Sequence, residues 1–401
     1  MSSIFQDLKV LDLTRVIAGP MCTQNLADMG ATVYKIERPG EGDDTRRMGP
    51  FEPGKASPRS VVYLSYNRGK QSITIDIATP EGAQLVRDLA VQCDVVIENY
   101  KVGTLERYGL DYDSLVRLNP RLVYCSITGF GQTGPDAGVA AYDFILQGMA
   151  GPMSVCGQPD GSPGAVPMRS SLPVTDVITG LYATSAITSA LYHRERTGEG
   201  QYIDMAMLDA SVAFMGHFAT AYLMADSVAT RVGNTNPIAA PSALFSCADG
   251  HLIIAAGNNK QWVALCGVLG IPDAPEDPRF ETNAKRCENR VALGHLIDPL
   301  IAAWERAPLL ARLQAAGVPA GPVNDMAQVF AEPQTIHREI AVTIAQPQGD
   351  VQMARSPYRF TKTPVQHRPS PDLGEHTNDV LMQDLGLSAE KVADLRQRGV
   401  L

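Results

Sequence analysis

The first third of the chain alternates between short apolar runs and helical patterns, and this alternation restricts the fold more than any other feature. A helical pattern at 21–29, closed by Gly30, separates the first two apolar runs and predicts a βαβ unit with parallel strands. A second helix is expected at 80–92. The sequence therefore predicts an α/β fold with a mostly parallel sheet and helices on both faces. The strand-like runs are residues 8–14, 32–38, 72–76, 94–98 and 122–127.

The second half of the chain has a different pattern. A chain of 401 residues exceeds what one hydrophobic core usually supports, so we expect two domains. Two helical stretches, 176–193 and 204–225, are followed by a hairpin signal at 243–256, centred on Asp249-Gly250. Helices are then expected at 261–269, 290–303 and 308–316. From Val323 onward a proline-bearing tail ends in a helix pair, which we expect to pack on the first domain or on a partner subunit.

Charge and composition exclude several classes of protein. The formal net charge of -9 disfavours a nucleic-acid or anionic membrane surface. The most apolar run, 203–225, contains Asp204, Asp209 and His217, so we interpret it as buried helix rather than a membrane span. The N-terminus shows no secretory signal, so we expect a cytoplasmic protein. No cysteine, histidine or carboxylate pattern has the spacing of metal ligands, and we expect no metal site.

Asp176 precedes the helical pattern at 177–193. Aspartate is a favoured N-cap, and local sequence alone favours this structural role. A carboxylate at a helix N-terminus is also expected to be held ionised and fixed in place, which suits a nucleophile. Both roles stay open at this point.

Several basic residues lie in or just after predicted strand ends, where open α/β sheets bind ligands. In an acidic chain this clustering indicates an anionic ligand, although for any single residue the sequence favours a solvated surface charge. The amide-rich Gly257-Asn258-Asn259 likewise has two interpretations, a helix cap or a flap over a site. The basic residues are Arg15, Arg38, Arg46, Arg47, Arg68, Lys70 and Arg107.

Residues 129–134 match the G-x-G-x-x-G pattern of dinucleotide sites. That pattern needs a helix whose N-terminus receives the pyrophosphate. Here Pro135-Asp-Ala-Gly138 follows at once, which is typical of a loop. We therefore interpret the match as a glycine-rich turn. An NAD-dependent oxidoreductase stays an alternative, which tight binding of nicotinamide would support.

Eight segments, in the same order along nearly the whole chain, resemble family III CoA-transferases, the group that includes formyl-CoA transferase and carnitine dehydratase-like proteins. One such segment alone would be a weak signal, whereas eight in order are specific. The segments are Val10–Pro20, Gly30–Gly40, Asn67–Lys70, Glu98–Tyr100, Cys125–Pro135, Thr175–Gly180, Gly317–Pro322 and Leu373–Thr377.

The resemblance implies a Rossmann-like α/β large domain built from both chain ends, a smaller α+β domain, and a homodimer whose two chains are interlocked. We therefore expect the large domain to span 1–203, followed by a helical linker at 204–228. The small domain would span 229–325, and a C-terminal segment, 326–401, would return to the large domain.

The resemblance also implies the site residues. Asp176 takes the place of the catalytic aspartate, and coenzyme A enters as an acyl-CoA substrate, with no permanently bound cofactor. Thr128 stands where formyl-CoA transferases have a lysine. The CoA-contacting positions correspond to Ala18, Arg38, Asn67, Arg68, Gly69, Lys70, Asn99, Tyr100, Arg107 and Thr128.

The chemistry implied by the family is covalent. Asp176 would attack the donor thioester to give a mixed anhydride, and the CoA thiolate would then form an aspartyl-CoA thioester. The related acyl-CoA racemases carry a histidine in an Ala-Gly-His-Asp motif, where this chain has Ala140-Ala-Tyr-Asp143. A tyrosine is a poor base near neutral pH, so the racemase alternative is disfavoured.

Three segments, Gly42–Arg46, Ala256–Gln261 and Gly317–Pro322, resemble the branch of the family that uses succinyl-CoA and glutarate. We therefore predict succinyl-CoA as donor and a dicarboxylate such as glutarate or itaconate as acceptor. A planar guanidinium can bind a carboxylate through two hydrogen bonds. The predicted substrate contacts are Gly257, Asn258 and Asn259, with Arg46, Arg47 or Arg169 on the distal carboxylate.

Overall fold

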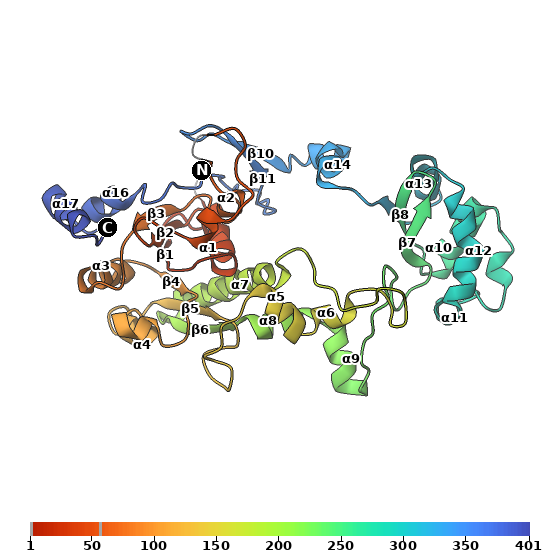
Figure 1. Cartoon of the computed structure of the whole chain (residues 1–401), viewed down its shortest axis with the longest axis horizontal. Helices are drawn as coiled ribbons and strands as arrows, with labels where there is room; N and C mark the ends of the chain where they lie inside the picture. The colour runs from red at the N-terminus through yellow and green to blue at the C-terminus, as the bar shows by residue number, and fades with distance from the viewer. Residues whose placement is uncertain (1–2, 56–57) are drawn as a thin grey trace. The chain divides into compact units, whose positions relative to one another are not determined.

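In the computed structural model, which describes residues 3–55 and 58–401, the chain divides into two compact units. Each unit has its own hydrophobic core. The larger unit combines the N-terminal half of the chain with its C-terminal end (Figure 1). It comprises the chain up to Pro152, Arg169–Val228 and Glu339–Leu401, and the smaller unit comprises Met153–Met168 and Ala229–Arg338.

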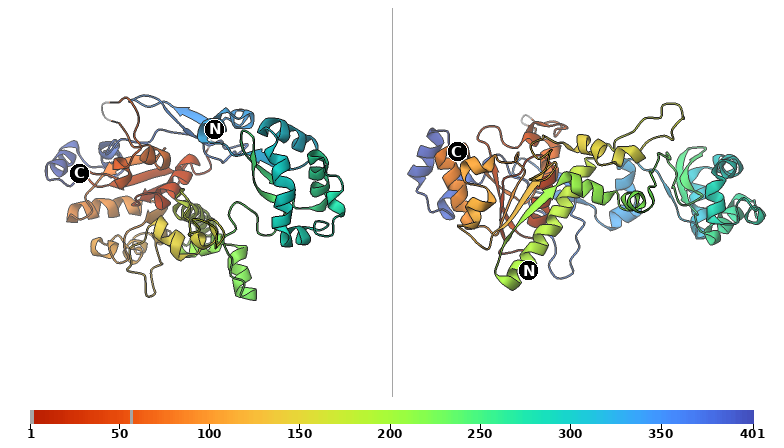
Figure 2. Two further views of the ribbon diagram at one scale, coloured as in Figure 1. Left: turned by 45° about the vertical axis from the view of Figure 1, so that its right-hand side comes forward. Right: turned by 90° about the horizontal axis from the view of Figure 1, so that it is seen from below.

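A six-stranded parallel sheet forms the centre of the larger unit, with strand order β3-β2-β1-β4-β5-β6. The predicted parallel sheet is thus confirmed. The sheet is visible between two sets of helices in Figure 2. Its strands are β1 (Lys9–Asp12), β2 (Thr32–Glu37), β3 (Gln71–Thr74), β4 (Val95–Glu98), β5 (Val123–Thr128) and β6 (Gln201–Ala206).

Helices cover both faces of the sheet because successive strand residues point to opposite sides. Val10 packs in the core beneath α1 and α7, whereas its neighbour Leu11 packs in the core shared with α3, α16 and α17. Both side chains are fully buried. The covering helices are α1 (Ala18–Asp28) and α7 (Val174–Thr197) on one face, and α3 (Pro80–Val91), α16 (Thr377–Gln383) and α17 (Ala389–Gln397) on the other.

The prediction of one helix over 204–225 is wrong at its start. Residues 201–206 form strand β6, which pairs with β5 so that Tyr202 lies opposite Tyr124. This pairing with a distant segment outweighs the local helical pattern. Helices α8 (Met207–Phe214) and α9 (His217–Ala225) follow. No helix in the described part of the chain is both long and apolar enough to cross a membrane.

The strand order reverses at β1, which pairs with both β2 and β4. The chain connects β1 to β2 on one side and β4 to β5 on the other, so the carboxyl ends of β1 and β4 leave a crevice between their loops. Open α/β sheets bind ligands at such a point.

The loops at this edge and the tail carry short elements. The tail is fastened to the sheet by backbone contacts: the amide of Gly69 donates to the carbonyl of Pro369, and that of Asp76 donates to the carbonyl of Val400. The short elements are η1 (Asp44–Arg47), α2 (Val61–Tyr66), η2 (Leu105–Tyr108), α4 (Tyr112–Val116), α5 (Asp143–Met149), α6 (Pro152–Val155), β10 (Ala341–Ile344) and β11 (Val351–Ala354).

The smaller unit packs helices on a three-stranded antiparallel sheet. The predicted hairpin around Asp249-Gly250 is confirmed, since β7 and β8 pair across this turn. The three predicted helices in this region are also found. The elements are β7 (Ser242–Cys247), β8 (Gly250–Ala255), α10 (Asn259–Leu269), η3 (Ala274–Glu276), α11 (Asn283–Glu288), α12 (Arg290–Ala302), α13 (Arg306–Ala315), β9 (Ala320–Pro322), α14 (Met326–Ala331) and α15 (Pro333–His337).

Candidate active site

A hollow of about 270 Å³ lies at the carboxyl ends of β1, β4 and β5, where the strand order reverses. We call it the reaction hollow. It brings Asp176 together with residues that follow three different strands. Its walls include Val16, Ala18, Asn99, Tyr100, Thr128, Tyr142, Asp143, Asp176 and Met207.

Asp176 is the third residue of α7, and Pro173 occupies the N-cap position without a side-chain hydrogen bond. The prediction that Asp176 caps the helix is therefore wrong. Asp143 supplies the cap from another element: its Oδ1 accepts hydrogen bonds from the amides of Thr175 at 2.7 Å and Asp176 at 3.3 Å. The carboxyl of Asp176 is thus free to face the reaction hollow.

Burial and the neighbouring charge of Asp143 raise the pKa of Asp176 to about 7. The expectation that a helix N-terminus holds this carboxylate ionised is therefore wrong. A helix N-terminus contributes at most about 1–2 kcal/mol to an anion, and here desolvation and a second carboxylate act against it. Asp176 is consequently poised between its neutral and ionised forms near neutral pH.

Gln147, a fully buried residue of α5, holds the segment before Asp176 in place. Its Nε2 donates to Oδ2 of Asp143 at 2.6 Å and to the carbonyl of Leu172 at 3.2 Å. Its Oε1 accepts from the amide of Ser170 at 2.9 Å. One amide side chain therefore links the capping carboxylate to the chain that leads into α7.

Sequence analysis missed two side chains near Asp176. Tyr66, at the end of α2, has its pKa raised by burial and by the charge of Asp176, so its hydroxyl lies within electrostatic range of that carboxyl. Asp143 was noticed only as the partner of a missing histidine. Tyr66 directly precedes the Asn67–Lys70 motif, which was the available signal.

A second hollow of about 190 Å³ lies beside the first at the ends of β2 and β3, and we call it the outer hollow. The two adjoin, because Arg15, Asp44 and Tyr100 line both. Arg38 also lines the outer hollow, together with the backbone segment Ile75–Ala78, which the sequence did not indicate.

The predicted CoA contacts fall into two groups. Ala18, Asn99, Tyr100 and Thr128 line the reaction hollow, and Arg38 lines the outer hollow. Arg107 is exposed on η2, between Thr104 and Tyr108 of the outer hollow.

The Asn67-Arg68-Gly69-Lys70 turn lines neither hollow. Arg68 is buried and pairs with Asp28 at 2.5 Å, and Lys70 pairs with Asp12 at 3.1 Å. Oδ1 of Asn67 accepts from Nζ of Lys70 at 2.8 Å. These side chains tie the sheet to α1, and their contact with CoA stays a prediction.

The three arginines expected to bind a distal carboxylate differ in their surroundings. Arg46 is held by Glu37 at 2.7 Å and lies over the ring of Tyr63. Arg47 is exposed, with Asp44 at 3.4 Å. Arg169 lies over the ring of Phe144, the residue next to Asp143.

The amide-rich segment belongs to the smaller unit, where its local contacts match a helix cap. Oδ1 of Asn258 accepts from the amide of Gln261 at 2.8 Å at the start of α10. Arg286 donates to the carbonyl of Gly257 at 2.8 Å and to Oδ1 of Asn259 at 3.1 Å. A role for these residues in substrate binding stays a prediction.

Three further features of the described residues concern metal, dinucleotide and racemase chemistry. No group of three or more histidine, cysteine or carboxylate side chains within them could hold a metal ion. The glycine-rich segment 129–134 is a loop that opens no helix, as interpreted from the sequence. Tyr142 occupies the position where racemases have histidine, and its side chain is 67% exposed.

Comparisons with known proteins identify the family of this chain. The family described as CoA-transferase family III matches residues 5–377. The chain is 45% identical over 381 residues to succinate–glutarate CoA-transferase of Agrobacterium fabrum, covering 94% of each chain. It is 38% identical over 398 residues to human succinyl-CoA:glutarate CoA-transferase, covering 99% of this chain and 89% of the relative.

A crystal structure of a CAIB/BAIF family protein from Brucella suis superposes with a TM-score of 0.85 at 45% identity, covering 95% of this chain and 99% of that chain. The fold, the sequence match over nearly the whole chain and the named relatives agree with one another. This chain belongs to CoA-transferase family III and is a CoA-transferase.

Proposed function

We propose that this enzyme moves CoA from succinyl-CoA to a dicarboxylic acid such as glutarate or itaconate. The relatives described above are named for succinate or succinyl-CoA and glutarate, which supports this donor and acceptor. The observation that carries the reaction is the placement of Asp176, a half-buried carboxyl with raised pKa in the hollow where the strand order reverses.

Acyl-CoA would lie along the two adjoining hollows, with its nucleotide end in the outer hollow and its thioester in the reaction hollow. Arg38 presents a cation at the outer end, since its side chain is 69% exposed and its only ion-pair partner in the described part of the chain is Glu41. Arg107 lies on the helix beside it. A guanidinium is suited to phosphate oxygens, which supports this orientation.

Asp176 would act as the nucleophile. Its ionised carboxylate attacks the thioester carbonyl, the carbon–sulfur bond breaks, and CoA leaves as a thiolate with a mixed anhydride left on the enzyme. The thiolate then attacks the carbonyl of Asp176, releasing succinate and forming an aspartyl-CoA thioester. The incoming dicarboxylate reverses these two steps and leaves with CoA.

The raised pKa of Asp176 is consistent with the proposed role of its carboxylate as nucleophile. Desolvation makes the ionised carboxylate a better nucleophile than one fully solvated in water. Asp143 places a fixed negative charge beside it and fixes the first turn of α7 through two amides. Asp143 would therefore act on the reaction through Asp176 rather than on the substrate directly.

Among the three arginines, we favour Arg169 as the partner of the distal carboxylate of the substrate. Its guanidinium stacks on Phe144, beside Asp143, and it forms no ion pair with the residues that the structure describes. Arg46, in contrast, already has its hydrogen bonds occupied by Glu37 and Tyr63.

We also propose that the protein is a homodimer, with interlocked chains, in the cytoplasm. Helix α9 supports the dimer: it is almost entirely apolar and none of its residues is buried. Leu223 and Met224 are 81% and 82% exposed. An apolar surface of this kind normally has a partner, and a second copy of the chain is the partner that the family suggests.

The decisive experiment incubates the enzyme with succinyl-CoA and a panel of carboxylic acids, and identifies the product CoA esters by mass spectrometry. Hydroxylamine added during turnover should modify Asp176, and the Asp176→Ala variant should give neither signal. Exchange of deuterium at the acyl α-carbon without transfer of CoA would instead identify a racemase and refute the proposal.

A further inference from the structure

Val16 adopts a left-handed backbone conformation, with φ at 71°. A β-branched residue in this region is a steric outlier, which costs about 1–3 kcal/mol and persists only where the surroundings enforce it. Val16 lines the reaction hollow and lies two residues before α1. Its conformation therefore decides how the chain turns from β1 into the wall that faces Asp176.

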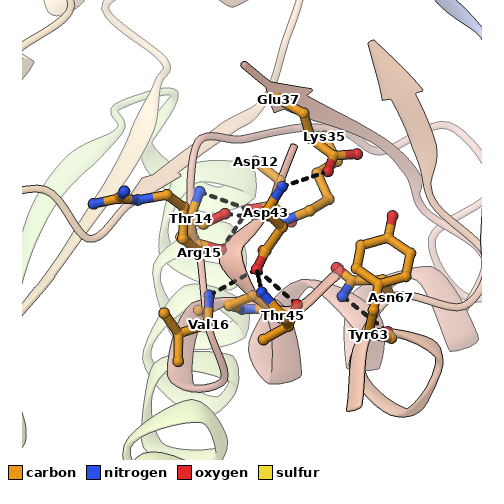
Figure 3. Close-up of polar contacts among 12 residues, drawn as sticks. Asp12, Thr14, Arg15, Val16, Lys35, Glu37, Asp43, Thr45, Tyr63 and Asn67 are labelled. Atoms are coloured by element: carbon orange, nitrogen blue, oxygen red, sulfur yellow. Dashed lines mark hydrogen bonds and ion pairs between the residues drawn. The ribbon is translucent and has the colours of Figure 1, made fainter. Parts of the chain in front are cut away.

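Side chains from β2 and from the loop that follows it hold this turn (Figure 3). Oδ1 of Asp43 accepts a hydrogen bond from the amide of Val16 at 3.3 Å. Nζ of Lys35 donates to Oδ2 of Asp43 at 2.9 Å and to the carbonyl of Thr14 at 2.9 Å. One buried ion pair thus holds the two peptide groups that lead into the strained residue.

A third side chain, that of Asn99, holds the same turn from the other side of the crevice. Asn99, which follows β4, accepts from the amide of Arg15 at 2.9 Å and donates to the carbonyl of Arg15 at 2.8 Å. Asp43 itself is fixed, because Oε2 of Glu37 accepts from its amide at 2.9 Å. Residues 14–16 therefore have little freedom before any substrate binds.

The burial of the ion pair indicates that it serves geometry more than stability. Lys35 and Asp43 are each only 1% exposed. A buried ion pair loses so much hydration energy that a well-packed apolar pair is often equally stable. The directed hydrogen bonds to the backbone of Thr14 and Val16 are what an apolar pair could not supply.

We propose that Lys35 and Asp43 are positioning residues of the active site, which hold Val16 in its left-handed conformation and so shape the wall against which Asp176 reacts. This inference rests on the proposed function of Asp176. Neither side chain needs to touch the reacting atoms.

Glycine adopts positive φ without strain, whereas alanine does not, and this difference supplies the test. Asp43→Ala is made in three backgrounds: wild type, Val16→Gly and Val16→Ala. Each variant is assayed for transfer of CoA from succinyl-CoA to glutarate, with kcat and KM measured separately. In wild type and in Val16→Ala, loss of the Asp43 hydrogen bonds should lower kcat by about tenfold or more, because the wall facing Asp176 is then misplaced.

In the Val16→Gly background the same substitution should change kcat by less than about threefold, because glycine keeps the turn without help. Equal losses in all three backgrounds, or an effect confined to KM for succinyl-CoA, would overturn the inference. If Asp43→Ala does not fold, Lys35→Met replaces it in the same three backgrounds.

Failure of the inference is distinguishable from failure of the proposed function. In the first case the wild-type enzyme transfers CoA and hydroxylamine modifies Asp176, but glycine at position 16 rescues nothing. In the second case the wild-type enzyme itself neither transfers CoA nor is modified.

Discussion

Buried charges are arranged in opposite ways at the two ends of the carboxyl edge of the sheet. Around β1, β2 and β3 the buried charges are paired: Lys70 with Asp12, Lys35 with Asp43, and Arg46 with Glu37. Around α5 and α7, Asp143 and Asp176 are neighbouring carboxylates, and neither forms an ion pair in the described part of the chain.

This difference corresponds to the two roles that we propose, one part that holds the active site in shape and one that reacts. Opposite charges hold the pKa of a buried carboxyl down: despite burial, Lys70 and Lys35 keep the pKa of Asp12 at about 2, while burial lowers the pKa of Lys70 itself to about 8. Burial with a like charge moves the pKa of Asp176 up to about 7. A group that titrates near the working pH is the one suited to covalent chemistry.

The largest effect is expected at the unpaired end. Asp176→Asn should reduce CoA transfer on the order of 10⁴-fold or more, because the amide cannot act as the nucleophile. The rate of CoA ester formation from succinyl-CoA and glutarate measures it. If the variant retained a tenth of the wild-type activity, Asp176 would not be the nucleophile.

The same variant provides its own control for folding. The folded state keeps Asp176 protonated up to about pH 7, whereas an ordinary aspartate loses its proton near 3.8. The stabilisation that protonated Asp176 gives the folded state is therefore complete below pH 3.8. It is lost as the pH rises through about 7. At pH 8, Asp176→Asn should be at least as stable as wild type in urea unfolding, so lost activity cannot be attributed to unfolding.

The next largest effect is expected at the paired end. Lys70→Met leaves Asp12 buried without its closest cation and should lower the free energy of unfolding by about 3–5 kcal/mol. The matched control is Lys391→Met, which removes an exposed pair with Asp394 and should cost less than about 1 kcal/mol. Similar losses in the two variants would show that the buried pairs have no special role.

Asp143→Asn tests the like-charge pair directly. The amide keeps an oxygen for the amides of Thr175 and Asp176. It removes the charge that, in addition to burial, raises the pKa of Asp176. Kcat/KM requires the ionised nucleophile, so its acid limb, near pH 7 in wild type, should move to lower pH. If the acid limb of the kcat/KM profile does not move, burial alone raises the pKa of Asp176.

The smallest effect is expected at the outer hollow. Arg38→Ala should raise KM for succinyl-CoA a few-fold, on the order of 1 kcal/mol, with kcat little changed. Arg121→Ala is the control, because Arg121 is a similarly exposed arginine that lines neither hollow. Equal KM values for the two variants would contradict binding of CoA at the outer hollow.

Much of the architecture was predictable because it depends on local pattern. Alternation of apolar runs and helical segments predicted the parallel sheet, and the Asp249-Gly250 turn predicted the β7–β8 hairpin. Strand β6 was not predictable in this way, because it forms by pairing with β5 and its own residues resemble the helices that follow.

The candidate site shows the same division. The sequence by itself determined the family, through eight ordered segments, and singled out Asp176, Arg38 and Tyr100. It also predicted Lys70 and Arg68 as ligand contacts, which stays a prediction, and in the structure both side chains are buried in ion pairs. A charged residue reads the same in sequence whether it faces solvent, a ligand or a buried carboxylate.

Only the tertiary structure decided the state and the setting of Asp176. The sequence suggested an ionised helix cap, but the cap comes from Asp143, 33 positions earlier in the chain. Desolvation and the interaction between two carboxylates depend on distances between segments far apart in sequence. The sequence therefore indicated Asp176 as the proposed nucleophile, and the packing of α5 against α7 decided its protonation.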